Sequence, residues 1–259
     1  MAQSLNIAML QVDLNWEHPE NNRSLFSKEI KALSKKVDLV ILPEMFTTGF
    51  SMNAEKLAEE TNGLTLLWMK ELAQRQDLAI TGSVIITENG NYYNRLYFVY
   101  PDGSYKTYDK RHTFTLAKED ETYTAGKDRL IVEYKGWRIC PLVCYDLRFP
   151  VFSRNTVDYD LLIYVANWPE KRVAAWDALL KARAIENMSY CLGLNRTGID
   201  GEGHRYNGHS VVYDCLGQNL TELDVVEPFS KEVELDYSHL TQTREKMKFL
   251  LDRDEFTLK

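Results

Sequence analysis

RICPLVCYDLRFP, residues Arg138–Pro150, is the stretch that decides the fold of this 259-residue chain. Its apolar run up to Val143 has the length of a buried strand. The run ends at Cys144, and Phe149-Pro150 then suits the start of a helix. A side chain at such a strand-to-helix turn faces the crevice where α/β proteins place their chemistry. The nearby helix N-terminus also predicts a lowered pKa for the Cys144 thiol.

The two cysteines of this stretch carry different predictions. Cys140 lies in the middle of the predicted strand, and free cysteine is most often a small buried apolar residue. We therefore expect Cys140 in the core. Position alone leaves two roles open for Cys144, a buried structural one and a reactive one.

Two further predicted strands end in residues with useful chemistry. DLVILPE, residues Asp38–Glu44, is an apolar strand that ends in a carboxylate, and YKTYDKRH, residues Tyr105–His112, is an alternating strand that delivers Lys110. Taken singly, such a glutamate or lysine is most often a solvated surface residue. Glu44, Lys110 and Cys144 each stand at the end of a predicted strand, and this shared position favours a functional role for them.

The motifs LPEMF around Glu44, YDKRH around Lys110 and VCYDLRFP around Cys144 together resemble the nitrilase superfamily of carbon–nitrogen hydrolases. They occur in the order of that family and span nearly the whole chain. The resemblance implies an α/β fold, a four-layer α-β-β-α sandwich. It also implies a Glu-Lys-Cys triad and association as a homodimer or larger homo-oligomer. We expect no cofactor and no metal, because side chains and a backbone N–H fill every role.

Each member of this triad has a chemical role in amide hydrolysis. Cys144 attacks the carbonyl carbon as thiolate and forms an acyl-thioester. Glu44 takes the thiol proton and passes it to the departing nitrogen. Lys110 stabilises the oxyanion, with the backbone N–H of Tyr145 as a second donor.

The resemblance also implies a second glutamate in the loop after the lysine. In related sequences it precedes a glycine by seven residues. That glycine is Gly126 here, so the spacing favours Glu119, while Glu121 remains a rival.

Two aromatic residues indicate a small, partly apolar acyl group. Phe46 follows Glu44, and Trp168 follows another predicted strand. Arg172 begins a helix, where the dipole disfavours a cation, so we treat it as a candidate for binding a substrate carboxylate. For Arg148 we expect a structural salt bridge near Asp146.

The stretches LPEMFTTGF, VCYDLRFP, ANWPEKR, and RAIEN followed by NRTG resemble most the omega-amidase branch. Its members hydrolyse the side-chain amide of 2-oxoglutaramate and 2-oxosuccinamate and release ammonia. An N-carbamoyl amino acid or amine hydrolase, or another aliphatic amidase, is the alternative within the family.

Two alternatives lie outside the family. His112, His204 and His209 supply material for a Cys–His hydrolase or transferase, although no local motif supports one. A non-catalytic scaffold with this fold is the other, and the complete Glu, Lys and Cys motifs argue against it. Metal ligands at a familiar spacing are not found.

Composition narrows the function classes further. We expect a single domain over residues 1–259, with the tail, about 238–259, packing on it or on a partner subunit. The net charge of −7 and the lack of a long basic cluster argue against nucleic acid, and no window approaches a membrane span. Met1–Ser4 does not begin like a signal peptide, and four cysteines do not make a disulfide scaffold. We expect a cytoplasmic enzyme whose partner is a small-molecule amide.

The coarse pattern of elements agrees with an α/β chain. A strand at 5–12, a helix from 21 or 22 to about 36 and the strand ending at Glu44 form a βαβ unit, which predicts parallel strands. Residues 45–63 are expected to be an irregular loop, and 172–187 the clearest helix.

Overall fold

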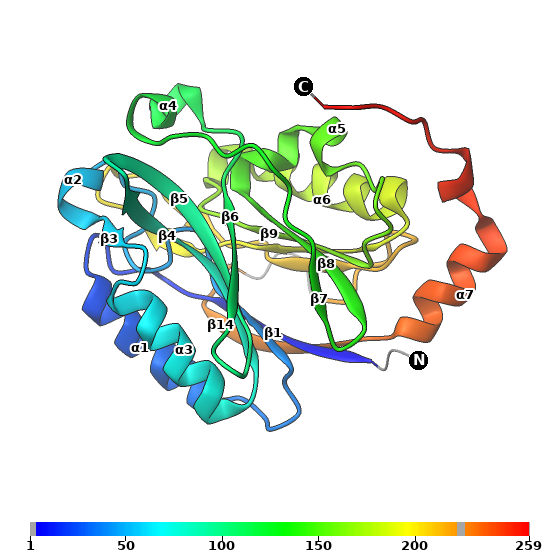
Figure 1. Ribbon diagram of the computed structural model, residues 1–259, viewed down its shortest axis with the longest axis horizontal. Helices are drawn as coiled ribbons and strands as arrows, with labels where there is room; N and C mark the ends of the chain where they lie inside the picture. Colours follow the sequence, from blue (N-terminus) through cyan, green and yellow to red (C-terminus); the bar gives the residue numbers. More distant parts are fainter. Residues whose placement is uncertain (1–3, 222–225, 259) are drawn as a thin grey trace.

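The computed structural model describes residues 4–221 and 226–258. Two large sheets pack face to face within this part of the chain, and helices cover both outer faces (Figure 1). The α-β-β-α four-layer sandwich expected from the sequence is therefore confirmed. Residues 1–3, on which the expectation about a signal peptide rests, lie outside the described residues.

The first sheet mixes parallel and antiparallel pairing. Its order is β14 (Phe229–Leu235), β1 (Leu5–Gln11), β2 (Leu39–Ile41), β4 (Ala79–Glu88), β5 (Asn91–Val99) and β6 (Tyr105–Asp109), with β3 (Glu59–Glu60) on β4. β1, β2 and β4 run parallel, as the βαβ pattern predicts. β4, β5 and β6 form an antiparallel meander that leads to Lys110.

The second sheet carries the stretch that decides the fold. Its order is β13 (Val211–Tyr213), β10 (Tyr190–Leu194), β9 (Leu161–Val165), β8 (Trp137–Val143) and β7 (Val132–Tyr134). β8, β9 and β10 run parallel, so their carboxyl ends meet at one edge. β11 (Thr197–Ile199) and β12 (Arg205–Asn207) form a separate hairpin beyond β10.

The helices complete the two outer layers. On the side of the first sheet lie α1 (Pro19–Ala32) and α3 (Leu64–Gln76), and on the side of the second lie α5 (Pro150–Ser153) and α6 (Val173–Asn187) (Figure 1). The connections hold the short helices α2 (Ala54–Leu57) and α4 (Glu119–Thr122). The stretch 45–63, expected to be irregular, thus contains α2 and β3, although most of it is loop.

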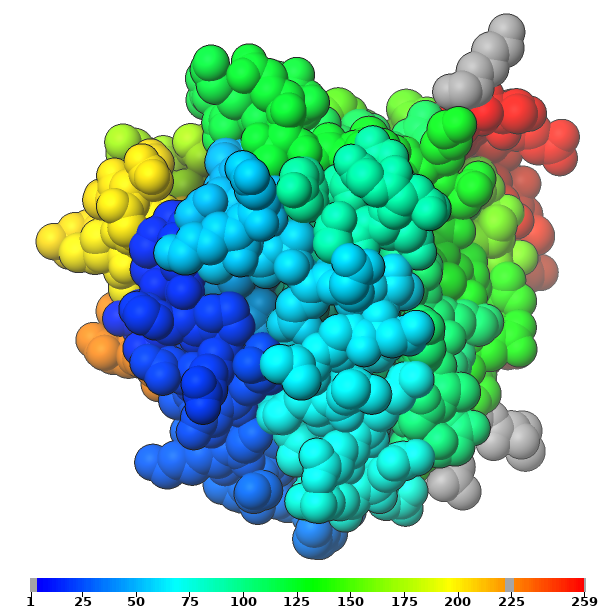
Figure 2. All heavy atoms as spheres, turned by 60° about the vertical axis from the view of Figure 1, so that its left-hand side comes forward, coloured from blue at the N-terminus to red at the C-terminus, as the bar shows by residue number. Residues whose placement is uncertain are grey.

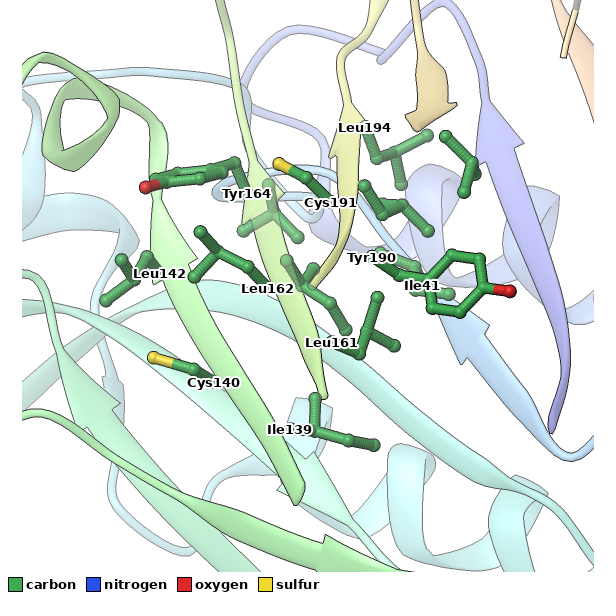
Figure 3. Close-up of a cluster of buried hydrophobic side chains, with 14 of the residues drawn as sticks. Ile41, Ile139, Cys140, Leu142, Leu161, Leu162, Tyr164, Tyr190, Cys191 and Leu194 are labelled. Atoms are coloured by element: carbon green, nitrogen blue, oxygen red, sulfur yellow. The ribbon is translucent and has the colours of Figure 1, made fainter. Parts of the chain in front are cut away.

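Alternation along β1 shows how the layers are filled. Ile7 and Met9 point into the core between the sheets, whereas Ala8 and Leu10 point toward α1 and α3. Successive strand residues face opposite sides of a sheet, so one strand serves two cores. Figure 3 shows part of the core between the sheets, where Ile41 of the first sheet lies among residues of the second.

The C-terminal segment packs along one edge of the sandwich (Figure 1). Asp236 caps the N-terminus of α7 (Tyr237–Met247), because its carboxylate accepts the backbone N–H groups of Ser238 and His239. Arg244 anchors the helix, because its guanidinium pairs with Asp160 at 2.7 Å. Beyond α7, Phe249 and Leu251 are exposed.

Among the described residues, none of the helices combines the length and the apolar character needed to cross a bilayer.

Candidate active site

Glu44 stands three residues beyond β2, at the edge where the sheets meet, and its side chain is fully buried. Its carboxylate oxygen Oε2 accepts a hydrogen bond from the Asn167 backbone N–H at 2.9 Å, and Oε1 accepts one from the Asn94 side chain at 2.9 Å. Because these donors approach both oxygens, the carboxylate is held in one orientation.

Lys110 directly follows β6, and its side chain is only 1% exposed. Its ammonium Nζ lies 2.9 Å from Glu44 Oε1 and 2.8 Å from Glu119 Oε2. Burial alone would lower the pKa of Lys110, but the two carboxylates reverse this and hold it above its ordinary value. The lysine is therefore a fixed positive charge.

Glu119, and not its rival Glu121, is the glutamate beside Lys110. Glu119 begins α4 and is fully buried, and the Phe114 backbone N–H also donates to it at 2.6 Å. Burial raises the pKa of Glu119, since the Lys110 charge offsets the desolvation only in part. Glu121 is exposed and pairs with Lys118 at 3.5 Å.

Cys144 directly follows β8 and has a positive φ of 46°, which is uncommon for a residue other than glycine. Asp146 stabilises the turn, because its Oδ2 atom accepts the Val143 backbone N–H at 3.0 Å. The Cys144 sulfur lies 3.9 Å from the Asn167 carbonyl oxygen and interacts with the Glu44 carboxylate. The structure thus brings Glu44, Lys110 and Cys144 together.

The prediction of a lowered thiol pKa is wrong. Burial raises the pKa of Cys144 well above its ordinary value, the Glu44 charge adds to this rise, and Lys110 opposes it. The residues after Cys144 form only a 3-10 turn, Cys144–Arg148, followed by the single-turn α5. So few aligned peptide dipoles do not outweigh desolvation. Cys140 lies in the core, as expected, and burial raises the pKa of its thiol to about 12.

Two asparagines that join this group, Asn94 and Asn167, are not among the predicted site residues. Asn94 on β5 donates to Glu44, and Asn167, just after β9, holds Glu44 through its backbone N–H and also through its side chain at 2.6 Å. The strand register is a signal that could have pointed to Asn94. β5 and β6 pair Arg95 with Asp109, and Asn94 and Lys110 are the residues next to this pair.

A cavity of about 380 Å³ opens beside Cys144 and Lys110. Aromatic side chains form much of its wall: Trp16, Phe50, Phe114, Tyr145, Trp168 and Tyr206. The hairpin of β11 and β12 forms part of its mouth through Asp200, Glu202 and His204. Figure 2 shows the loop around residues 200–205 (yellow) projecting from the surface beside the N-terminal segment (blue).

Three of the four predicted substrate-binding residues line this cavity, namely Tyr145, Trp168 and Arg172. Phe46 does not. It is fully buried between α1 and α3, where its ring contacts Phe26 and Trp68. The chain beyond Glu44 turns, so Phe46 points to the outer face of the first sheet, and the aromatic residue from this loop is Phe50 instead.

Arg148 also lines the cavity, and the salt bridge expected near Asp146 does not form. Asp146 is instead occupied by the Tyr108 hydroxyl at 2.7 Å and by His112 at 2.7 Å. The Arg148 guanidinium lies 4.9 Å from the centre of the Trp168 ring. Arg172 lies in the same way over Phe114, at 5.0 Å. Within the described residues, neither of these arginines forms a salt bridge.

The histidines that suggested a Cys–His enzyme have other neighbours. His112 contacts Asp146 and stacks on Phe149, His204 lies 3.4 Å from Asp200 and His209 lies 3.2 Å from Asp177. In the described part of the chain, His, Cys, Asp and Glu side chains form no cluster placed to hold a metal ion.

Comparisons with known proteins agree with one family. The family model for the carbon-nitrogen hydrolase matches residues 6–245. The chain is 44% identical over 256 residues to omega-amidase YafV of Yersinia enterocolitica, covering 98% of this chain and 99% of that protein. It is 33% identical over 244 residues to 2-oxoglutaramate amidase of Bacillus subtilis, covering 92% and 93%.

A solved structure extends the likeness to three dimensions. It is XC1258 from Xanthomonas campestris, described as a CN-hydrolase superfamily protein with an arsenic adduct in the active site. It superposes with a TM-score of 0.96 at 43% identity, and the match covers 99% of both chains.

Proposed function

This chain belongs to the carbon–nitrogen hydrolase family, and on that premise we propose that it is an omega-amidase. It hydrolyses the terminal amide of a short dicarboxylic monoamide, such as 2-oxoglutaramate or 2-oxosuccinamate, and releases ammonia. The observation that carries the proposal is the buried group of Glu44, Lys110 and Cys144 at a cavity that also holds two arginines without salt bridges among the described residues.

The first step follows from the protonation of the nucleophile. Because burial keeps Cys144 as a thiol, it needs a base when it attacks. Glu44 accepts the thiol proton while the sulfur bonds to the amide carbon. The two hydrogen bonds from Asn94 and Asn167 hold the carboxylate for this transfer.

Lys110 stabilises the charge that develops on the amide oxygen. Its ammonium is already desolvated and held between two carboxylates, so little reorganisation is needed during the reaction. The backbone N–H of Tyr145, the residue after the nucleophile, is the second donor in this proposal. Glu119 keeps the lysine in place.

Collapse of the tetrahedral intermediate breaks the C–N bond. Glu44 gives its proton to the departing nitrogen, which leaves as ammonia, and an acyl-thioester remains on Cys144. Water then attacks the thioester with Glu44 as base, which releases the carboxylic acid and restores the thiol. Each proton that Glu44 takes is returned, so the cycle closes.

The cavity supports a small substrate with a carboxylate at the far end. Its volume of about 380 Å³ suits a small molecule. Arg148 and Arg172 stack on aromatic faces and keep their guanidinium N–H groups available for an anion. Phe50 and Trp168 limit the length of the acyl chain in this proposal.

Ammonia release from a panel of amides tests the assignment. We expect the highest kcat/KM with the monoamides of 2-oxo dicarboxylic acids, and low values with neutral amides of the same length. Turnover of an N-carbamoyl compound with failure of every keto-acid amide would place the protein among the carbamoylases. Absence of any turnover, with a folded protein, would favour a scaffold role.

We further propose a cytoplasmic homodimer or larger homo-oligomer built from a single domain. The exposed Phe249 and Leu251 beyond α7 support an interface near the C-terminal segment. The four cysteines are free and buried, which suits a reducing compartment. Sedimentation of the wild type and of a Leu251→Glu variant tests this, and a monomer in both would overturn the oligomer proposal.

A further inference from the structure

Asn94 bridges the two buried glutamates of the site. It lies on β5, and its side-chain Nδ2 donates to Glu44 Oε1 at 2.9 Å and to Glu119 Oε1 at 3.3 Å. Both partners are carboxylate oxygens, so the amide nitrogen must face them. Lys110 Nζ contacts the same two oxygens, each at 2.9 Å.

This arrangement pairs one charged donor with one neutral donor. Two carboxylates share a single cation, and the Oε1 atom of each carboxylate receives one bond from Lys110 and one from Asn94. A second cation in place of Asn94 would bind the carboxylates more strongly but would make Glu44 a poorer base. A third carboxylate would have the opposite effect. A neutral amide orients Glu44 without either change.

The fold itself does not account for this side chain. The backbone carbonyl of Asn94 already serves the sheet, because it accepts the Lys110 N–H at 3.0 Å. The side-chain Oδ1 is buried and receives no hydrogen bond from a described protein group. An unpaired buried acceptor costs about 1–3 kcal/mol, so this oxygen does not stabilise the fold, and the contribution of the side chain comes from Nδ2 and its two carboxylate partners.

We propose that Asn94 is a positioning residue for the reaction. It acts through Glu44, which it aims at the Cys144 thiol, and its bridge holds Glu44 and Glu119 in fixed positions around Lys110. The proposal rests on the proposed function, in which Glu44 is the base. It assigns Asn94 no contact with the substrate, so its loss acts on kcat more than on KM.

The ionisable groups around Asn94 come from several elements. Glu44 lies beyond β2, Lys110 beyond β6, Glu119 on α4 and Cys144 beyond β8. Tyr123, after α4, faces the same group, and burial followed by the Glu119 charge raises the pKa of its hydroxyl. A negative charge added at position 94 would therefore interact with a cluster that already contains more carboxylates than cations.

The test compares Asn94→Ala and Asn94→Asp with the wild type. Asn94→Ala should lower kcat on the order of 10²-fold with little change in KM, because a small misplacement of a reacting group has effects of this size. Asn94→Asp should also shift the acidic limb of the kcat/KM profile to higher pH. Asn155→Ala is the matched control, since Asn155 is equally buried and bonds to Tyr159 and Asn187.

A second measurement needs no substrate. The rate of Cys144 alkylation by iodoacetamide, followed by mass spectrometry, reports whether Glu44 still accepts the thiol proton. We expect both Asn94 variants to react more slowly than the wild type at neutral pH, because both lose the donor that orients Glu44 and the aspartate charge also disfavours the thiolate, and we expect Asn155→Ala to react at the wild-type rate. This readout stays valid if the preferred amide is a different one.

Two results would overturn the proposal. One is a kcat and an alkylation rate in Asn94→Ala within about threefold of the wild type, far from the 10²-fold expected for misplacement. The other is a loss that follows only the folded fraction, measured by thermal unfolding, and that Asn155→Ala reproduces. If Asn94→Ala does not fold, the near-isosteric Asn94→Asp still decides the question through its pH profile and its alkylation rate.

Discussion

The hydroxyl of Tyr108 donates a hydrogen bond of 2.7 Å to Asp146. Tyr108 lies on β6, two residues before Lys110, and Asp146 lies two residues after Cys144. This bond therefore ties the strand that delivers the cation to the turn that carries the nucleophile, across the boundary between the sheets.

Tyr108→Phe should destabilise the protein and lower its turnover. The change removes one of the donors to the buried Asp146, and loss of a hydrogen bond to a charged group costs about 1.5–3 kcal/mol. Urea denaturation and kcat measure the two effects. Tyr134→Phe is the control, because that hydroxyl donates to the Asp38 backbone carbonyl at 3.0 Å, away from the reacting group, and turnover should survive. An equal loss of kcat in Tyr108→Phe and Tyr134→Phe would show that the hydrogen bond between Tyr108 and Asp146 has no specific role in turnover.

Cys144→Ala and Cys144→Ser should abolish turnover and leave the fold intact, although alanine and serine must accept the same positive φ. Cys140→Ala should lower the free energy of unfolding without loss of chemistry, because that thiol is in the core. Steady-state ammonia release and thermal unfolding check both. Near-normal activity in a Cys144 variant would remove it as the nucleophile.

Glu44→Gln should lower kcat by about 10²–10⁴-fold, the usual contribution of a positioned general base. Lys110→Ala should lower kcat by about 10²–10³-fold, the usual effect of removing one donor to the oxyanion. For the auxiliary glutamate, Glu119→Gln should impair turnover and Glu121→Gln should not, since Glu119 contacts Lys110 whereas Glu121 pairs with Lys118. The reverse order in this matched pair would contradict the assignment.

Arg172→Ala and Arg148→Ala should mainly raise KM for amides that carry a carboxylate, because each removes binding that is equal in the ground and transition states. A neutral amide of similar length should be little affected. Lys171→Ala is the matched control, since its side chain is exposed and does not line the cavity. An equal loss on charged and neutral substrates would show that the arginines stabilise the structure rather than bind the ligand.

Stability should fall at alkaline pH through the buried thiols. Burial raises the folded-state pKa of Cys140 to about 12, whereas an unfolded cysteine ionises near pH 8.5. Above about pH 8.5 the unfolded state has lost a proton that the folded state keeps, so the free energy of unfolding declines by about 1.4 kcal/mol per pH unit for each such thiol. Urea denaturation from neutral pH to about pH 10 should show a shallower decline for Cys140→Ala than for the wild type. A parallel decline would contradict the assignment.

The position of Glu44, Lys110 and Cys144 at strand ends predicted that they meet, and the family resemblance carried by their three motifs implied the sandwich. Phe46 was misplaced because side-chain direction past a strand end depends on how the loop turns, and Arg148 because its expected partner Asp146 is occupied by residues distant in sequence. Asn94 was not predicted as a site residue, because its role depends on the positions of two glutamates from other elements of the fold.

The reacting group draws on both sheets, with Glu44, Asn94 and Lys110 from the first and Cys144 and Asn167 from the second. Neither layer alone contains both a nucleophile and its base. A chain with only one layer formed therefore lacks Glu44 and Lys110 beside Cys144 and cannot carry out the proposed amide hydrolysis. Amide hydrolysis therefore requires that the two layers pack together, and activity should be lost on heating when they separate.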